Sequence, residues 1–286
     1  MRLISYQSPT GPRTAALRGA AAVDLNRTDP AVPDCMKKLL AQGPAGLERA
    51  GQAAARGQPM PLDGLRLAAP VPLPDKVICI GLNYADHARE TGMALPPEPV
   101  VFSKFATAVR AHGDPIVLPR ASSQVDYEAE LVVVIGQGGR HIAEADARRH
   151  VAGYCCGNDV SARDWQLRKP GGQWLLGKSF DSFAPFGPAL VTADEVPEPG
   201  SLKIQLRLNG QVMQDSSTAQ LIFSVDKLVA YLSTVCTLAP GDLIFTGTPP
   251  GVGMARKPPV WLKPGDVTEV EIEGLGVLRN PLVAEA

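Results

Sequence analysis

Short apolar runs separated by turn residues dominate the chain from residue 76 onward. Runs of this length, rich in β-branched residues, are typical of strands. They predict strands over Lys76–Ile80, Val100–Ser103, Ile116–Leu118, Ala129–Ile135, Lys203–Leu208, Gln211–Gln214, Leu243–Thr246, Val267–Ile272 and Gly276–Leu278. Helical periodicity is confined to Ala85–Thr91, Glu144–Val151, Ser161–Leu167 and Val225–Thr234. Because strands and helices do not alternate regularly, the pattern disfavours a Rossmann or TIM-barrel fold and favours an irregular β-sandwich or rolled sheet, mainly β with some α (α+β).

The first 67 residues follow a different pattern. Three short strand-like segments precede two Ala- and Leu-rich helical stretches, at Arg2–Tyr6, Thr14–Leu17, Ala22–Leu25, Cys35–Ala41 and Ala45–Arg56. Regularly spaced prolines then make a stiff connector. The sequence therefore predicts a small N-terminal α/β domain over residues 1–67, a linker over 68–75 and a main domain over 76–286.

Composition narrows the class of protein. The 286 residues are 45% apolar and 20% charged, with a formal net charge of −1, so no basic field favours nucleic acid or an anionic membrane. No apolar run approaches the roughly 18–20 residues that span a bilayer. The five cysteines are irregularly spaced, and the N-terminus lacks the layout of a signal peptide. These features predict a cytoplasmic enzyme with reduced thiols that binds neither nucleic acid nor membrane.

Acidic residues gather where the predicted strand Ala129–Ile135 begins. Side chains alternate between the two faces of a strand, so Asp126, Glu128 and Glu130 are expected on one face. Like charges this close repel one another, and no Lys or Arg lies between them in the sequence. A cation or bound protons must therefore neutralise the face.

Asp159 offers another carboxylate at an expected strand-to-helix junction, with Asn158 and Ser161 beside it as polar support. An oxygen-only cluster suits a hard divalent cation, Mg²⁺ before Zn²⁺. The alternative is a solvated strand face that carries scattered acids without any ligand.

The predicted helix Ala85–Thr91 carries a candidate dyad. Asn83 can cap its start, and Gly92 can end it in the left-handed conformation. His87 and Glu90 are three residues apart, so they are neighbours on one helix face. A carboxylate on one imidazole nitrogen makes the other a stronger base for activating water. An exposed ion pair of no catalytic importance is the alternative.

Three further segments can contribute to a site. Lys178 follows a glycine-rich stretch and can bind a substrate carboxylate or the oxyanion of an enolate, although a surface lysine is the alternative. The loop Thr246–Gly253 can hold an anion or be only a tight turn. The proline-rich loop Thr91–Lys104 is typical of lids over active sites, and Lys104 can enter the site from it.

In their order along the chain, these segments resemble the fumarylacetoacetate hydrolase superfamily. The resemblance rests on Gly81–His87, Phe102–Lys104, Asp126–Leu131, Asn158–Gln166, Gly177–Asp181, Leu238–Gly253 and Leu262–Gly276. The N-terminal residues resemble the small N-terminal domain of that family only loosely. The segments Ser161–Gln166 and Gln173–Lys178 are most similar to one particular branch of it.

The resemblance implies a mixed β-sandwich roll of the fumarylacetoacetate hydrolase C-terminal type, usually a homodimer, with Mg²⁺ or Mn²⁺ as cofactor. By position, the metal ligands would be Glu128, Glu130 and Asp159, and the water-activating dyad would be His87 and Glu90. Lys178 would steady an enolate or a substrate oxygen, and the substrate pocket would be lined by Lys104, Arg163, Gln166 and Thr248. Asp126 matches no ligand in the smaller family members and is assigned a supporting role.

The same resemblance implies small 2-oxo or diketo acids as substrates, which react through an enolate held by the metal. Hydrolysis of a C–C bond in an acylpyruvate-like acid is the reaction expected first. Keto–enol tautomerisation or decarboxylation of oxaloacetate is the close alternative, because it uses the same enolate without a nucleophilic water. A non-catalytic metal- or ligand-binding module is the remote alternative, disfavoured because both Glu128 and His87 are present.

Overall fold

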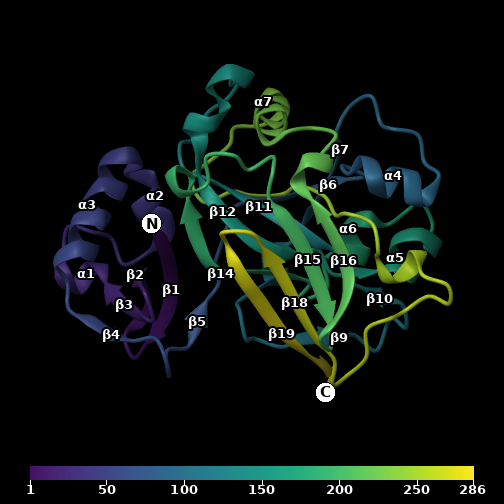
Figure 1. Cartoon of the computed structure of the whole chain (residues 1–286), viewed down its shortest axis with the longest axis horizontal. Helices are drawn as coiled ribbons and strands as arrows, with labels where there is room; N and C mark the ends of the chain where they lie inside the picture. The colour runs from purple at the N-terminus through teal and green to yellow at the C-terminus, as the bar shows by residue number, and fades with distance from the viewer.

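The computed structural model describes all 286 residues, and a mixed sheet of 12 strands runs through the whole molecule (Figure 1). Its strands run in the order β4 (Pro59–Pro61), β3 (Ala21–Asp24), β2 (Gly11–Arg18), β1 (Arg2–Ser8), β14 (Ala184–Thr192), β12 (Val151–Asn158), β11 (Ala129–Ile135), β17 (Leu243–Phe245), β6 (Val77–Gly81) and β7 (Val100–Lys104). Two short strands lie off this path: β5 (Leu67–Ala68) pairs with β1, and β8 (Val109–Arg110) pairs with β14.

A second sheet of five strands lies in front of the main sheet in Figure 1. Its order is β16 (Gln211–Ser217), β15 (Lys203–Leu208), β18 (Val267–Ile272), β19 (Gly276–Ala284) and β9 (Ile116–Leu118). A separate pair consists of β10 (Val125–Asp126) and β13 (Ser161–Ala162). The two large sheets enclose the main hydrophobic core, as the predicted sandwich requires.

Strand β11 lies at the centre of the fold and is buried on both faces. Leu131 and Val133 belong to the core between the two sheets. Val132 and Val134 belong to a second core that also contains residues of the N-terminal helices. This explains why residues 131–135 of β11 are a continuous apolar run without the alternation of a half-exposed strand.

The helices are short and lie outside the sheets. They are α1 (Leu25–Thr28), α2 (Met36–Ala41), α3 (Gly43–Arg56), α4 (Ala85–Thr91), α5 (Arg163–Arg168), α6 (Trp174–Lys178) and α7 (Val225–Val235). The predicted helix over Glu144–Val151 is instead a 3₁₀ segment at Glu144–His150, because Val151 already has extended backbone geometry and begins β12. Helices α4, α5 and α6 gather at one end of the molecule, on the right of Figure 1.

Two central strands, β12 and β14, were not predicted from the sequence. Each is buried almost throughout, so neither shows alternating polarity, and both contain glycine. Gly153 in β12 is required because a Cβ atom there would overlap the carbonyl oxygen of Val191 in β14. Residues that weaken a strand in isolation therefore permit close strand packing here.

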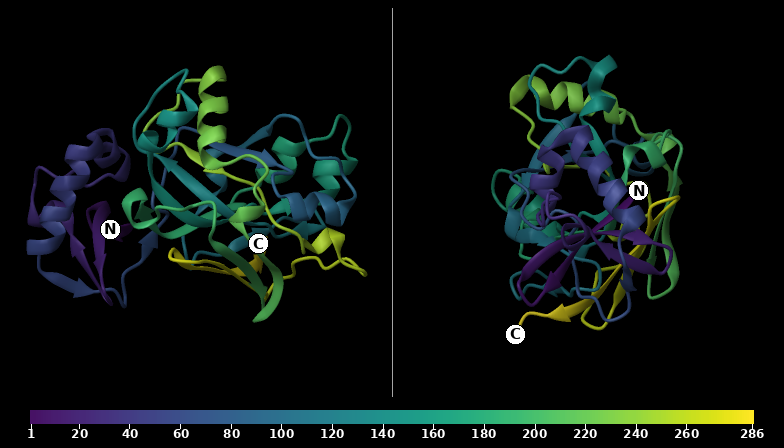
Figure 2. Two further views of the ribbon diagram at one scale, coloured as in Figure 1. Left: turned by 45° about the horizontal axis from the view of Figure 1, so that its top comes forward. Right: turned by 90° about the vertical axis from the view of Figure 1, so that its left-hand side faces the viewer.

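The N-terminal residues form a layer of helices over strands at the left of Figure 1, and Figure 2 shows this part at one end of the molecule. Strand β1 pairs antiparallel with β14, so the N-terminal strands extend the main sheet. The boundaries 1–67, 68–75 and 76–286 stay a prediction. Every helix of the structure is too short or too polar to cross a bilayer.

Candidate metal centre and active-site cavity

Strands β11 and β12 bring three of the predicted carboxylates together. The strands pair antiparallel with Ala129 opposite Asn158. Glu128 and Glu130 flank Ala129, and Asp159 follows Asn158, so the register places the three acids at the same end of both strands. One oxygen from each carboxyl group lies within 4.8 Å of the others, and all three residues are buried. An all-oxygen set at this spacing suits a hard divalent cation.

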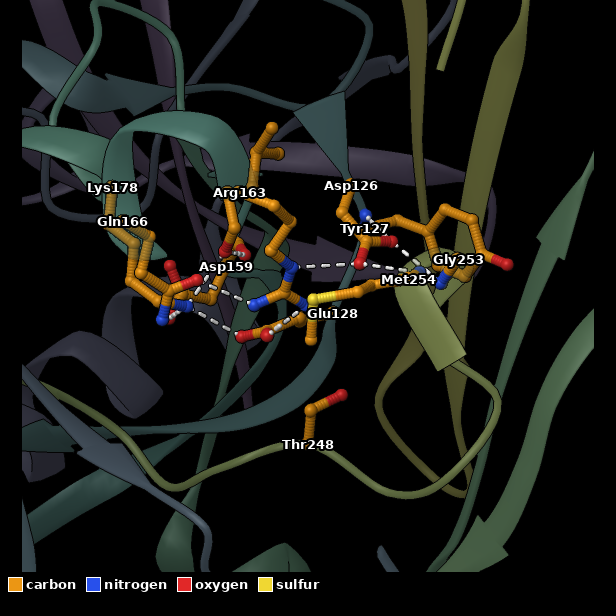
Figure 3. A network of polar contacts seen from close by, with 12 residues as sticks. Asp126, Tyr127, Glu128, Asp159, Arg163, Gln166, Lys178, Thr248, Gly253 and Met254 are labelled. Atoms are coloured by element: carbon orange, nitrogen blue, oxygen red, sulfur yellow. Dashed lines mark hydrogen bonds and ion pairs between the residues drawn. The ribbon is translucent and has the colours of Figure 1, made fainter. Parts of the chain in front are cut away.

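Asp126 lies outside this cluster of candidate metal ligands. It belongs to β10, and the chain is irregular between β10 and β11, so the alternation of a single strand does not extend back to it. Its buried carboxylate accepts hydrogen bonds from Arg163 Nε at 2.8 Å and from the backbone N–H groups of Gly253 at 2.7 Å and Met254 at 3.1 Å (Figure 3). Asp126 therefore connects a cavity-lining arginine to the loop after β17.

Three buried cations, Lys178, Arg163 and Lys104, lie against the carboxylates. Lys178 donates to Glu128 at 2.8 Å, to Asp159 at 2.7 Å and to the Ser161 hydroxyl at 2.7 Å. These three bonds use all the hydrogens of its ammonium group. Arg163 adds an ion pair of 2.6 Å to Glu128 (Figure 3). The positive charge that the sequence required beside these carboxylates thus comes from side chains distant in the sequence.

Lys104 does not line the cavity, although the sequence suggested that it would. It is the last residue of β7 and is buried, and its ammonium group donates to the Asp159 carboxylate and to the backbone carbonyl of Val160. Its charge is thus directed at a candidate metal ligand.

The candidate ligands differ in their electrostatic environment. Burial raises the pKa of Glu128, but Lys178 and Arg163 offset this and hold that pKa at about 2. Burial, together with the negative charges of Asp159 and Glu128, raises the pKa of Glu130 well above its usual value. Glu130 accepts one backbone hydrogen bond, from Gly247 at 2.8 Å, and forms no ion pair with any Lys or Arg.

These environments match the needs of a bound cation. The buried carboxylates of Asp126, Glu128 and Asp159 are paired with Arg163, Lys178 or Lys104, which leaves Glu130 to be neutralised by a proton or a metal ion. The residues present therefore fit a divalent cation such as Mg²⁺ or Mn²⁺.

A cavity of about 300 Å³ opens beside the carboxylates. This lies at the small end of the volumes seen for ligand sites in proteins, so it suits a small organic acid. Its polar lining consists of His87, Thr91, Glu128, Glu130, Arg163, Gln166, Lys178 and Thr248, and its apolar lining of Ile80, Leu82, Met93, Phe102, Leu167, Trp174 and Met254. Of the four predicted pocket residues, Arg163, Gln166 and Thr248 are thus brought together and Lys104 is not.

The predicted dyad is hydrogen-bonded on α4. His87 Nδ1 lies 3.0 Å from Glu90 Oε2, and Glu90 also accepts the Gly251 N–H at 3.0 Å. Gly92 ends the helix with a φ of 68°, as expected. Asn83 does not cap the helix, because Tyr84 occupies the N-cap position and the Oδ1 atom of Asn83 instead accepts the N–H of Phe223 at 2.8 Å.

Several residues of the site gave little signal in the sequence. Trp174 and Phe102 meet edge to face at 5.4 Å and form an apolar wall. Gly81 leaves room for this wall, because a Cβ atom there would lie 2.8 Å from the Trp174 ring. Gln214 of β16 lies behind Thr248 and was missed entirely, because a single glutamine in a strand has no distinguishing pattern.

The fold and the carboxylate-lined cavity define a type of protein with a candidate metal site, and comparison with known proteins gives its family. Residues 76–283 match the model for the fumarylacetoacetate (FAA) hydrolase C-terminal domain. The chain therefore belongs to the fumarylacetoacetate hydrolase family and is an enzyme, and the predicted α+β fold of that type is confirmed.

The relatives identify the branch of the family. The chain is 50% identical to the oxaloacetate tautomerase FAHD2A, mitochondrial, of Bos taurus, over 99% of this chain and 92% of that protein. Among solved structures, the fumarylacetoacetate hydrolase of Exiguobacterium antarcticum is 36% identical with a TM-score of 0.87, over 100% of both chains. Maleylpyruvate hydrolase of Sphingobium sp. SYK-6, in complex with manganese(II) ion and pyruvate, is 31% identical with a TM-score of 0.83, also over 100% of both chains. The chain is also 49% identical to fumarylacetoacetate hydrolase domain-containing protein 2 of Pongo abelii, a member of the branch that Ser161–Gln166 and Gln173–Lys178 suggested.

One prediction is contradicted by these relatives. The sequence was expected to be that of a cytoplasmic protein, yet the names of its relatives at 49–50% identity in Bos taurus and Homo sapiens place those proteins in mitochondria. Reduced, unpaired cysteines are compatible with more than one compartment, so they were a poor guide to location.

Proposed function

We propose that this enzyme interconverts the enol and keto forms of oxaloacetate or a closely similar 2-oxo dicarboxylic acid, with a divalent metal ion as cofactor. The observation that carries the proposal is the cluster of Glu128, Glu130 and Asp159 beside a cavity of about 300 Å³. A relative that is 50% identical over 99% of this chain and is named an oxaloacetate tautomerase supports this choice of reaction.

The metal would be held by Glu128, Glu130 and Asp159. When bound, it supplies a Lewis acid that polarises the 2-oxo carbonyl of the substrate and favours the enolate. Mg²⁺ is the proposed ion because the donor set contains only carboxylate oxygens, and Mn²⁺ would serve in the same site.

The chain's own residues would provide charge and proton transfer. Lys178 keeps a positive charge beside the carboxylates and offsets negative charge that develops on the enolate oxygen. His87 has Nδ1 directed at Glu90, so Nε2 is left to take the proton from the enol O–H and to deliver a proton to C3. Arg163, Gln166 and Thr248 would bind the substrate carboxylates.

A second reaction is supported by the same dyad. If His87 instead removes a proton from water, the resulting hydroxide can attack the distal carbonyl of an acylpyruvate and break its C–C bond. The contact between His87 and Glu90 favours this hydrolysis, and so does the resemblance to a maleylpyruvate hydrolase. Decarboxylation of oxaloacetate would proceed from the same enolate.

An assay panel separates these reactions. Enol absorbance and pyruvate release are measured with enol-oxaloacetate, acylpyruvates and fumarylpyruvate, in the presence of Mg²⁺. The proposal predicts rapid loss of enol absorbance from oxaloacetate without formation of pyruvate. If the enzyme released pyruvate from an acylpyruvate with a higher kcat/KM than it shows for enol-oxaloacetate, hydrolysis would be its main reaction and the proposal would be wrong. Release of pyruvate from oxaloacetate would indicate decarboxylation.

The family resemblance also supports a homodimer as the working form. Strand β7 is the last strand of the main sheet, and Val100 and Val101 on it and Phe105 just after it are exposed. Light scattering on the purified protein should give twice the chain mass of 30.2 kDa. A mass equal to that of one chain across the working concentration range would contradict the dimer.

A further inference from the structure

A buried amide lies behind the polar wall of the cavity. Gln214 of β16 is 1% exposed, and its Nε2 atom donates a hydrogen bond of 2.8 Å to the hydroxyl oxygen of Thr248, which lines the cavity. Gln214 has no role in the proposed chemistry, and it does not itself line the cavity.

The orientation of this amide is fixed by two backbone groups. Its Oε1 atom accepts the N–H of Ala129 at 2.8 Å, and its Nε2 atom donates to the carbonyl of Pro249 at 2.8 Å. A backbone N–H can only donate and a backbone carbonyl can only accept, so flipping the amide would break both bonds. Gln214 must therefore present an N–H, and not an oxygen, to Thr248.

The fixed amide determines which way the Thr248 hydroxyl acts. Because its oxygen accepts from Gln214, the hydroxyl hydrogen must point elsewhere, and this hydroxyl donates no hydrogen bond to a protein acceptor. Gln166, a neighbour in the cavity wall, is constrained similarly: Arg163 donates to its Oε1 at 2.9 Å, which leaves the amide hydrogens of Gln166 for a ligand.

We propose that Gln214 is a positioning residue that fixes the Thr248 hydroxyl as a hydrogen-bond donor to a carboxylate of the substrate. This inference rests on the proposed function, which supplies a dicarboxylate ligand. Ala129 lies between Glu128 and Glu130 in the sequence, so the same amide ties the position of the donor to the strand that carries two candidate metal ligands. A substrate carboxylate offers only acceptors, and a donor oriented in advance binds it without reorganisation.

The test measures binding rather than turnover. Malate is the probe, because it is a dicarboxylate that carries a 2-hydroxyl group and no 2-oxo group, so it does not tautomerise. Its affinity is measured by calorimetry with saturating Mg²⁺ for wild type, Thr248→Val, Gln214→Met and the double variant, and thermal melting establishes that each protein is folded.

The proposal predicts strong non-additivity between the two positions. Thr248→Val should weaken malate binding about tenfold or more, because a hydrogen bond to a charged group is lost. Gln214→Met should weaken it about threefold to tenfold in the wild-type background and less than about twofold in the Thr248→Val background. Equal effects of Gln214→Met in both backgrounds would show that Gln214 does not act through the hydroxyl and would overturn the proposal.

Two further variants keep the test decisive if Gln214→Met does not fold. Gln214→Glu is nearly isosteric but presents an acceptor to Thr248, so it should turn the hydroxyl hydrogen away from the cavity and weaken malate binding more than Thr248→Val does. Gln211→Glu places the same charge at an exposed position of β16 and should bind malate as wild type does. Wild-type affinity in Gln214→Glu or in Thr248→Val would overturn the proposal. If wild type itself does not bind malate, the dicarboxylate function fails, and this inference fails with it.

Discussion

The two halves of the cavity are built very differently. The carboxylate half comes from the paired strands β11 and β12, and the side chains of Asp159 and Lys178 there are 0% and 2% exposed. The dyad half comes from the short helix α4, where the side chains of His87 and Glu90 are 14% and 29% exposed. One half is fixed by a central sheet and by buried ion pairs, and the other lies next to the proline-rich loop.

This difference suggests a division of labour. Tautomerisation, decarboxylation and hydrolysis all require a bound metal and a stabilised enolate. The carboxylate half, which is held by the central sheet and buried ion pairs, would provide both. Proton transfer and the activation of water depend on the dyad half, which is more accessible. The amount of solvent that reaches His87 can therefore decide between tautomerisation and hydrolysis. The following predictions separate the two halves, beginning with the largest expected effect.

Replacing Glu130 with glutamine should abolish metal binding by the carboxylate half. The substitution removes the one carboxylate without a protein cation and leaves an amide of the same shape, so metal binding should be lost and turnover should fall by about 10³-fold or more. Calorimetry with Mg²⁺ and the enol assay measure the two effects. Glu273→Gln, at an exposed turn, is the matched control. Unchanged Mg²⁺ affinity in Glu130→Gln would remove this residue from the metal site.

Replacing His87 with alanine should abolish acid–base catalysis by the dyad half and leave the carboxylate half intact. Loss of a general acid–base group typically lowers turnover by about 10²–10⁴-fold, while Mg²⁺ affinity should stay within about twofold of wild type. Arg89→Ala, exposed on the same helix, is the control. If tautomerisation survived in His87→Ala while acylpyruvate hydrolysis was lost, His87 would serve only to activate water. Another residue would then have to transfer the proton during tautomerisation.

Replacing Asp126 with asparagine should affect the placing of Arg163 beside the carboxylate half of the cavity. The carboxylate accepts from Arg163, Gly253 and Met254, and an amide can accept fewer of these bonds. We expect KM to rise about tenfold with a smaller change in kcat, and the free energy of unfolding to fall by about 1–3 kcal/mol. Steady-state kinetics and chemical denaturation provide the two readouts, and a KM equal to that of wild type would contradict a role in placing Arg163.

Metal affinity should depend on pH through Glu130. The pKa of this group is raised in the metal-free protein, so a proton competes with the metal, and the affinity should fall as pH is lowered through the raised pKa. The decrease should be at most about tenfold per pH unit for one proton. Calorimetry at several pH values tests this, and an affinity independent of pH would mean that Glu130 is ionised without the metal.

Much of the fold was predictable because local signals agreed with tertiary packing. Strands β11 and β15 and helix α4 have the bounds predicted from composition and periodicity. Strands β12 and β14 were missed because both of their faces are buried and their glycines permit close packing, information that only the neighbouring strand supplies. The predicted helix at Glu144 became a 3₁₀ segment because tertiary structure begins a strand at Val151.

The candidate site likewise contains residues that local sequence signals indicate and residues that only tertiary contacts place. Glu128, Glu130 and His87 could be proposed as candidates from residue type and short spacing, and the strand register brings the two glutamates together with Asp159. The position of Lys104 behind Asp159 and the role of Gln214 depend on contacts across 55 and 34 residues of sequence, which local spacing does not encode.

The most direct test of the central claim is the decay of enol-oxaloacetate after the metal is removed. The chelated and dialysed enzyme should leave the enol to decay at its uncatalysed rate, and addition of Mg²⁺ or Mn²⁺ should restore rapid loss of enol absorbance without release of pyruvate. Full activity in the chelated enzyme, with calorimetry showing no bound metal, would contradict a metal-dependent site at Glu128, Glu130 and Asp159.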